Sequence, residues 1–234
     1  MGLLYKKEMY LFFSTPFGFV FLGFFLLLSG IMFTIYNLVG GNSDMTGMFD
    51  LLKNSAFLIF PILTMRSFAE ERRLGTEQLL LTSRLNNVQI VLAKYFASLT
   101  VFAIGLGCTL FYMIFIRKYG QPNTGLTVAG YFGFFLLGAA MIAVCLLMAC
   151  FAENQITAAV LSFGVLFLLV ILASLSKSLS VPVVTPILSA LAITVRYDDF
   201  TLGVLKSGSI VYYVFFSFAC VFMTVKCLSR RQYL

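Results

Sequence analysis

The sequence predicts an all-α, polytopic membrane protein in which residues 1–234 form a single transmembrane domain with six transmembrane helices. Hydrophobic residues make up 61% of the chain and charged residues 11%, whereas soluble domains carry roughly 25% charged residues. About 20 helical residues cross a hydrocarbon core roughly 30 Å thick. A chain of 234 residues therefore has room for six spans with connecting loops, but not for a separate catalytic domain of ~100 residues.

The N-terminal segment, residues 1–15, mixes apolar side chains with the charged pair Lys6 and Lys7. This composition is typical of an amphipathic interfacial helix at the cytosolic membrane surface, with both lysines anchored among lipid headgroups. A disordered tail is the alternative. Pro16 suits the first position of the next helix, and the uncharged run Phe17–Val39 is the predicted first span.

The second span is harder to place, because only the twelve residues Asn54–Met65 separate Lys53 from Arg66. Twelve residues are too few to cross a bilayer, so the helix must extend beyond one or both charges. We expect Lys53 to extend outward to the interface and Arg66 to act as an anchor at the cytosolic interface. Pro61 is expected to kink the helix.

Four further apolar runs complete the predicted set. Lys94 lies near the start of the third span and is predicted to be another interface anchor. The polar break at Glu153 is short, so five or seven spans are alternatives to six. The long loop 176–208 is interrupted by prolines, so we expect short re-entrant helices on the extracytoplasmic side. Spans three to six are predicted at Val88–Ile116, Leu126–Ala152, Gln155–Leu175 and Ser207–Val225.

Charge asymmetry predicts the orientation. With six spans both termini lie on one side, and that side carries ten of the 16 Lys and Arg residues. Because Lys and Arg are retained in the cytosol, we expect a multi-pass protein of the inner (plasma) membrane with both termini cytoplasmic. The formal charge of +7 is explained by this asymmetry and does not indicate a nucleic-acid partner.

The residue inventory argues against an enzyme. The chain has no His and no Cys-x-x-Cys pair, and its spans are almost free of charge, so His-based metal sites and general bases are excluded. It also lacks the Gly-x-x-x-x-Gly-Lys-Ser/Thr loop that binds ATP phosphates. We expect no cofactor, and any ATP hydrolysis must belong to a partner.

The exception to this charge-poor pattern is the segment 61–87, which holds seven of the 25 charged residues. Arg66 and Glu70 stand four residues apart and can pair on one helix face. Gly75 is a natural helix end, and Thr76 can cap a second short helix that carries leucines outside the membrane. Such an exposed apolar helix indicates a docking partner, although a hairpin lying on the membrane is the alternative.

This segment resembles one found in ABC transporter permeases of the type-2 exporter class. Within that class the chain is most similar to small six-span permeases associated with gliding motility and nitrous oxide reductase maturation. The residues that carry the resemblance are Pro61, Thr64, Met65, Arg66, Phe68, Glu70, Glu71, Gly75, Thr76, Glu77, Leu79, Leu80, Leu81 and Thr82, with Lys94 and Tyr95 further on.

The resemblance implies that two permease subunits form a dimeric translocation pathway, each docked on a separate cytosolic ATP-binding cassette ATPase. Residues 67–87 would then be the coupling region, whose short helix transmits nucleotide-driven movement to the spans. It further implies electrostatic contacts with the ATPase and burial of two leucines at that contact. An ATP-independent secondary transporter or channel remains the alternative, and a membrane enzyme is a weaker one. The implied coupling residues are Glu70, Glu71, Arg72, Gly75, Thr76, Glu77, Leu80, Leu81 and Thr82.

Overall fold

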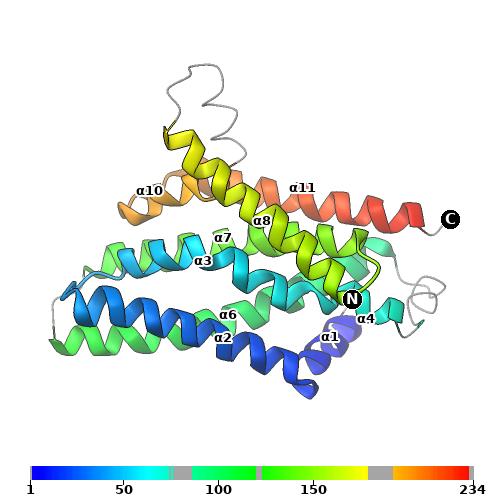
Figure 1. Cartoon of the computed structure of the whole chain (residues 1–234), viewed down its shortest axis with the longest axis horizontal. Helices are drawn as coiled ribbons and strands as arrows, with labels where there is room; N and C mark the ends of the chain where they lie inside the picture. Colours follow the sequence, from blue (N-terminus) through cyan, green and yellow to red (C-terminus); the bar gives the residue numbers. More distant parts are fainter. Residues whose placement is uncertain (1, 74, 76–85, 120–122, 179–191, 232–234) are drawn as a thin grey trace.

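The computed structural model describes residues 2–73, 75, 86–119, 123–178 and 192–231, and this part of the chain is helical with no strand. Long helices lie side by side in a bundle (Figure 1). The elements are α1 (Gly2–Ser14), α2 (Pro16–Phe33), the π-helix η1 (Thr34–Val39), α3 (Thr46–Thr64), α4 (Arg66–Arg73), α6 (Asn87–Tyr119), α7 (Thr124–Phe151), α8 (Gln155–Ser178), η2 (Val195–Tyr197), α10 (Asp198–Thr201) and α11 (Ser207–Arg231).

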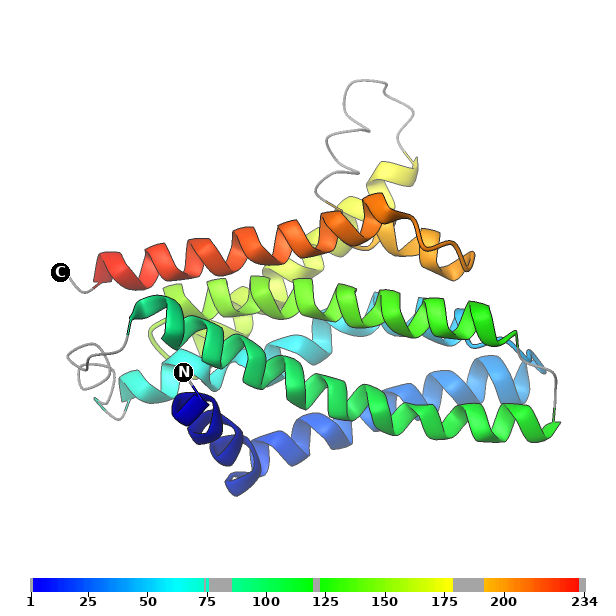
Figure 2. The same ribbon diagram turned by 180° about the vertical axis from the view of Figure 1, so that it is seen from behind.

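Six segments among the described residues are long and apolar enough to cross a membrane, which confirms the predicted number of candidate spans. A break at Ala152–Asn154 separates α7 from α8, so Glu153 does separate two spans. The two chain ends, α1 and α4 lie toward the same end of the bundle, while α10 lies at the other (Figures 1 and 2). The six segments are Pro16–Val39, Thr46–Arg72, Asn87–Lys118, Thr124–Phe151, Gln155–Ser176 and Ser207–Arg230.

Helix α7 forms the centre of the bundle and packs against α3, α6, α8 and α11. Its small residues permit this close packing. The ring of Phe200 occupies the space that a Cβ atom on Gly133 would need, and the ring of Phe102 does the same at Gly138. Because a larger side chain at either glycine would meet an aromatic ring, these two glycines allow close packing around α7.

The second span has the extended form that the sequence predicts. Helix α3 begins at Thr46, before Lys53, and contains Pro61 in its interior. The helical run breaks only at Met65, whose backbone N–H donates to the carbonyl of Pro61 over 2.9 Å. It then continues as the charged helix α4, so the span extends past both of the charges that limited it in the sequence.

Lys53 makes contacts that the sequence did not predict. Only 6% of the residue is exposed, and its reach to a membrane interface remains a prediction. The ammonium contacts Asp50 at 2.8 Å and Asp198 at 2.6 Å and lies over the ring of Tyr197, 5.4 Å from its centroid. Lys53 therefore ties α3 to α10 across the end of the bundle.

Residues 192–206, the described end of the predicted loop 176–208, fold back against the bundle. Tyr197 and Phe200 are fully buried, and the Tyr197 hydroxyl donates to the backbone carbonyl of Gly130 over 3.4 Å. Helix α10 is stabilised further by Asp199, which accepts from Lys206 at 2.5 Å and from Ser209 at 2.8 Å. Residues 179–191 of this loop lie outside the described residues, and the expected re-entry into the membrane remains a prediction.

Candidate functional site

The N-terminal segment forms the helix α1, which turns away from the axis of α2 and lies across one end of the bundle (Figure 2). Its buried face carries Leu4 and Glu8, which stand four residues apart and therefore share one side of the helix. The Tyr5 hydroxyl is 2.9 Å from the hydroxyl of Thr100 in α6. The location of α1 at a membrane surface remains a prediction.

Beneath α1 lies a buried ionic cluster centred on Lys94. Only 2% of this residue is exposed, and its ammonium contacts Glu8 of α1 at 3.2 Å and Glu71 of α4 at 2.9 Å. The ammonium also donates to the backbone carbonyl of Ser67. Because a buried charge is stable only when it is paired and hydrogen-bonded, Lys94 ties three helices together at one point.

Glu71 also forms an ion pair with a second cation, Lys7 of α1. Its other carboxylate oxygen, Oε1, contacts the ammonium of Lys7 at 3.3 Å. Glu71 therefore bridges Lys94, which is buried, and Lys7, whose side chain is 44% exposed. This bridge runs from the inside of the protein to its surface.

Arg66, at the start of α4, makes the predicted pair with Glu70. Its Nε atom donates to Glu70 Oε2 over 2.7 Å and its Nη2 atom donates to the same oxygen. The remaining guanidinium nitrogen, Nη1, donates to the hydroxyl of Thr15 over 2.9 Å, and the guanidinium lies 4.1 Å from the centroid of the Phe17 ring. Arg66 thus joins α4 to the connection between α1 and α2.

The far end of α4 contacts the turn between α7 and α8. Arg72 Nη2 donates to the carbonyl of Cys150 over 2.7 Å, and Nη1 donates to the carbonyl of Ala152. Gly75 follows with φ +67°, and its N–H donates to the carbonyl of Arg72 over 3.0 Å. This left-handed conformation is the one expected of a glycine at a helix end.

Several of the predicted site residues lie in the described part of the chain. Glu71 and Arg72 lie in α4 and contact other elements of the bundle, whereas Glu70 pairs with Arg66 of the same helix. The role of Lys94 as a membrane-interface anchor remains a prediction, and its ammonium contacts two carboxylates inside the protein. Lys6 is exposed on α1. Thr76, Glu77, Leu80, Leu81 and Thr82 lie outside the described residues.

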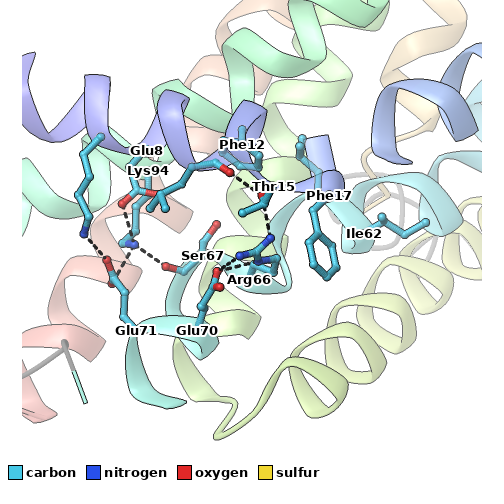
Figure 3. A pocket seen from close by; sticks show the side chains of 13 residues that line it. Glu8, Phe12, Thr15, Phe17, Ile62, Arg66, Ser67, Glu70, Glu71 and Lys94 are labelled. Carbon is cyan, nitrogen blue, oxygen red and sulfur yellow. Dashed lines mark hydrogen bonds and ion pairs between the residues drawn. The ribbon is translucent and has the colours of Figure 1, made fainter. Parts of the chain in front are cut away.

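A cavity of about 200 Å³ lies between α1, the end of α3 and the start of α4. Figure 3 shows its walls: Glu8, Lys94 and Glu71 gather at one end, while Phe17 and Ile62 lie at the other. Arg66 and Glu70 lie between the two ends. The cavity is therefore amphipathic, with its ionic groups already arranged in pairs.

Sequence reasoning missed the role of Glu8. The signal was present, because Glu8 shares its helix face with the apolar residue Leu4, and a charged side chain on such a face needs a partner. Lys94 is the isolated charge of span three and supplies that partner. The two residues are 86 positions apart, so neither local pattern alone indicated the pair.

The fold and its apolar surface define a multi-pass helical membrane protein. Comparison of the chain with protein-family models and with curated proteins finds no match. A more specific assignment therefore rests on the resemblance of residues 61–95 to exporter permeases, considered together with the geometry of α4.

Proposed function

We propose that this chain is the permease subunit of an ATP-driven ABC exporter of the type-2 class. In this proposal two permease subunits form the translocation pathway, and each binds a separate cytosolic ATP-binding cassette ATPase through the segment that follows Gly75. The observation that carries the proposal is the attachment of α4. Helix α4 leads into the segment that resembles a coupling helix. Its charged side chains join it to α1, α6 and the α7–α8 turn.

This attachment offers a mechanical route from the ATPase to the spans. Helix α4 follows α3 after a break at one residue, Met65, so movement of the coupling segment would displace the end of span two. Glu71 would transmit the same displacement to span three through Lys94. Arg72 would transmit it to the turn between spans four and five.

In this proposal the coupling residues have two different roles. Glu71 is 9% exposed and Arg72 contacts backbone carbonyls, so in this proposal both hold α4 against the bundle. Glu77, Leu80 and Leu81 remain the residues assigned to the ATPase contact, with the two leucines buried at the interface. Glu70 pairs with Arg66 of the same helix through its Oε2 atom, and in this proposal it also contributes to the electrostatic contact with the ATPase.

An ATP-independent transporter or channel is the weaker alternative. Such proteins usually carry charged or coordinating groups near the middle of the membrane. The central helix of this bundle, Thr124–Phe151, contains no charged residue. The buried cations Lys53 and Lys94 each lie near the start of their span. They lie at opposite ends of the bundle (Figure 1), where they join helices to each other.

Co-purification tests the proposal. The affinity-tagged chain is isolated from membranes of its own host, bound proteins are identified by mass spectrometry, and vanadate-sensitive ATP hydrolysis is measured. We expect an ABC ATPase to be enriched with the unmodified chain. Glu77→Lys and Leu80→Asp should each reduce its recovery by about tenfold or more, because losing a desolvated interface contact costs roughly 2–5 kcal/mol and 1.4 kcal/mol is tenfold.

Leu3→Asp is the matched control, because Leu3 is 87% exposed on α1 and lies outside the coupling region. It should leave ATPase recovery unchanged. The proposal is refuted if no ABC ATPase accompanies the unmodified chain. The coupling-helix assignment alone is refuted if the ATPase is present and remains bound to both coupling variants.

A further inference from the structure

A cavity of about 440 Å³ lies at the α10 end of the bundle, opposite the end that holds α1 and α4 (Figure 1). We call it the α10 cavity. Residues of α3, of the last turns of α8 and of the segment 192–201 form its wall. Cavities that bind small molecules usually measure about 300–1,000 Å³, so the α10 cavity has the size of a ligand site.

Polar side chains form much of this wall. Asp50, Lys53 and Asn54 come from α3, while Thr194 and Asp198 come from the segment before and within α10. The Lys53 ammonium contacts the Oδ1 atoms of both aspartates. The other oxygen of Asp50, Oδ2, accepts no hydrogen bond from the described residues, so it can accept one from a ligand.

The hydroxyl of Thr194 is the observation that points to a ligand. Only 4% of this residue is exposed, yet its side chain makes no hydrogen bond with the described part of the chain, and it stands at the N-terminus of η2 without capping it. Buried hydroxyls normally have a partner, as Thr201 has in the carbonyl of Asp198 at 2.8 Å. Thr194 therefore offers the cavity an unused donor and acceptor.

The charge of the wall favours a cation. Among the described residues that line the cavity, the carboxylates of Asp50 and Asp198 face the single ammonium of Lys53. Burial, and after it these two carboxylates, raise the pKa of Tyr197 well above its usual value, which indicates a negative potential here. A metal ion fits less well, because Mg²⁺ and Ca²⁺ take about six or more oxygen ligands and the described residues contain no group of three metal-binding side chains.

We propose that the α10 cavity binds a small hydrophilic organic cation, a primary amine that also carries hydroxyl groups. The ammonium of the ligand contacts the carboxylate of Asp50, and one of its hydroxyl groups makes the hydrogen bond that Thr194 lacks. Lys53 stays between the two aspartates and holds α3 and α10 in place around the ligand. The site lies at the opposite end of the bundle from α4, and the inference is independent of the proposed ATPase partner.

Binding of three matched polyols to the purified protein tests the inference. Glucamine, sorbitol and gluconate share a six-carbon hydroxylated chain and are respectively cationic, neutral and anionic at neutral pH. Each is titrated into the protein in detergent, and binding is measured by saturation-transfer NMR. We expect glucamine to bind about tenfold more tightly than sorbitol, because a hydrogen bond to a charged group carries a difference of this order. Gluconate should show no saturable binding.

Two variants locate the site. Asp50→Asn should weaken glucamine binding about tenfold and leave sorbitol binding unchanged, because it removes only the charge. Thr194→Val removes the hydroxyl at nearly constant shape and should weaken both ligands about threefold or more; it decides the matter if Asp50→Asn does not fold. Asp44→Asn is the control, because it removes a carboxylate from the turn before α3, outside the cavity wall, and it should leave glucamine binding unchanged.

Three results would overturn the proposal. The first is the absence of saturable glucamine binding to the unmodified protein. The second is binding of sorbitol or gluconate that equals or exceeds that of glucamine. The third is glucamine binding that a folded Asp50→Asn or Thr194→Val variant leaves unchanged.

Discussion

Replacement of Lys94 by Met should destabilise the protein by far more than replacement of an exposed lysine. The substitution leaves the carboxylates of Glu8 and Glu71, which are 6% and 9% exposed, facing each other without the ammonium that separates them. Removing one partner of a buried ion pair costs about 3–5 kcal/mol. For a chain of this size 1 kcal/mol corresponds to roughly 2–4 °C in melting temperature, so the expected loss is about 6–20 °C.

Unfolding can be followed with a thiol-reactive fluorogenic dye, because Cys145 and Cys150 are fully buried in the folded protein. Lys6→Met is the matched control and should change the melting temperature by less than ~2 °C, since exposed substitutions usually cost no more than about 0.5 kcal/mol. The double variant Lys94→Met/Glu8→Leu should regain most of the loss. It removes one unpaired carboxylate, and replacing a buried ion pair by apolar side chains is often neutral.

The result that refutes this reasoning is a Lys94→Met protein that melts within ~2 °C of the Lys6→Met control. A double variant no more stable than Lys94→Met would also count against it. In that case the destabilisation would come from lost packing around the Lys94 side chain, and not from the two carboxylates.

Three further predictions concern other parts of the molecule. Gly138→Leu should lower the melting temperature by several degrees relative to Gly164→Leu, where a Cβ atom meets open space, because overpacking against Phe102 costs about 1–3 kcal/mol. Hydrogen bonds from Lys206 and Ser209 lower the pKa of Asp199. Asp199→Asn should therefore be less stable than the unmodified protein at pH 7, and this difference should shrink as the pH falls below about 4 and through the lowered pKa. Cysteine placed at Ser43 in a cysteine-free background should react with a membrane-impermeant maleimide from outside intact cells, and labelling only after lysis would reverse the predicted orientation.

The six spans could be predicted because their signal is local. Each is a run of apolar residues long enough to cross a bilayer, and turn-forming or charged residues mark the ends. The i, i+4 pair of Arg66 and Glu70 and the helix end at Gly75 were predictable for the same reason, since each depends only on the spacing of neighbouring residues.

The contacts of the buried lysines were not predictable from such patterns. Lys53 pairs with Asp198, which lies 145 residues further along the chain, and Lys94 pairs with Glu8, which lies 86 residues before it. Local patterns predict that a lysine near the end of a span reaches toward the interface, but they do not identify its partners. In this protein α1 and α10 fold over the two ends of the bundle and bring a carboxylate to each lysine.

The ionic cluster under α1 also has a consequence for biosynthesis. Chains are made from the N-terminus, so Glu8 and Glu71 have both left the ribosome before Lys94 does. A lysine in the middle of a membrane helix raises the free energy of insertion by about 2.5–3.5 kcal/mol. Lys94 lies near the start of its helix, and both counter-ions are synthesised before it. We therefore expect pairing with them during insertion to lower this free-energy cost. A nascent chain that lacks residues 2–14 has no Glu8 to pair with Lys94. Its third span should therefore insert into the membrane less efficiently.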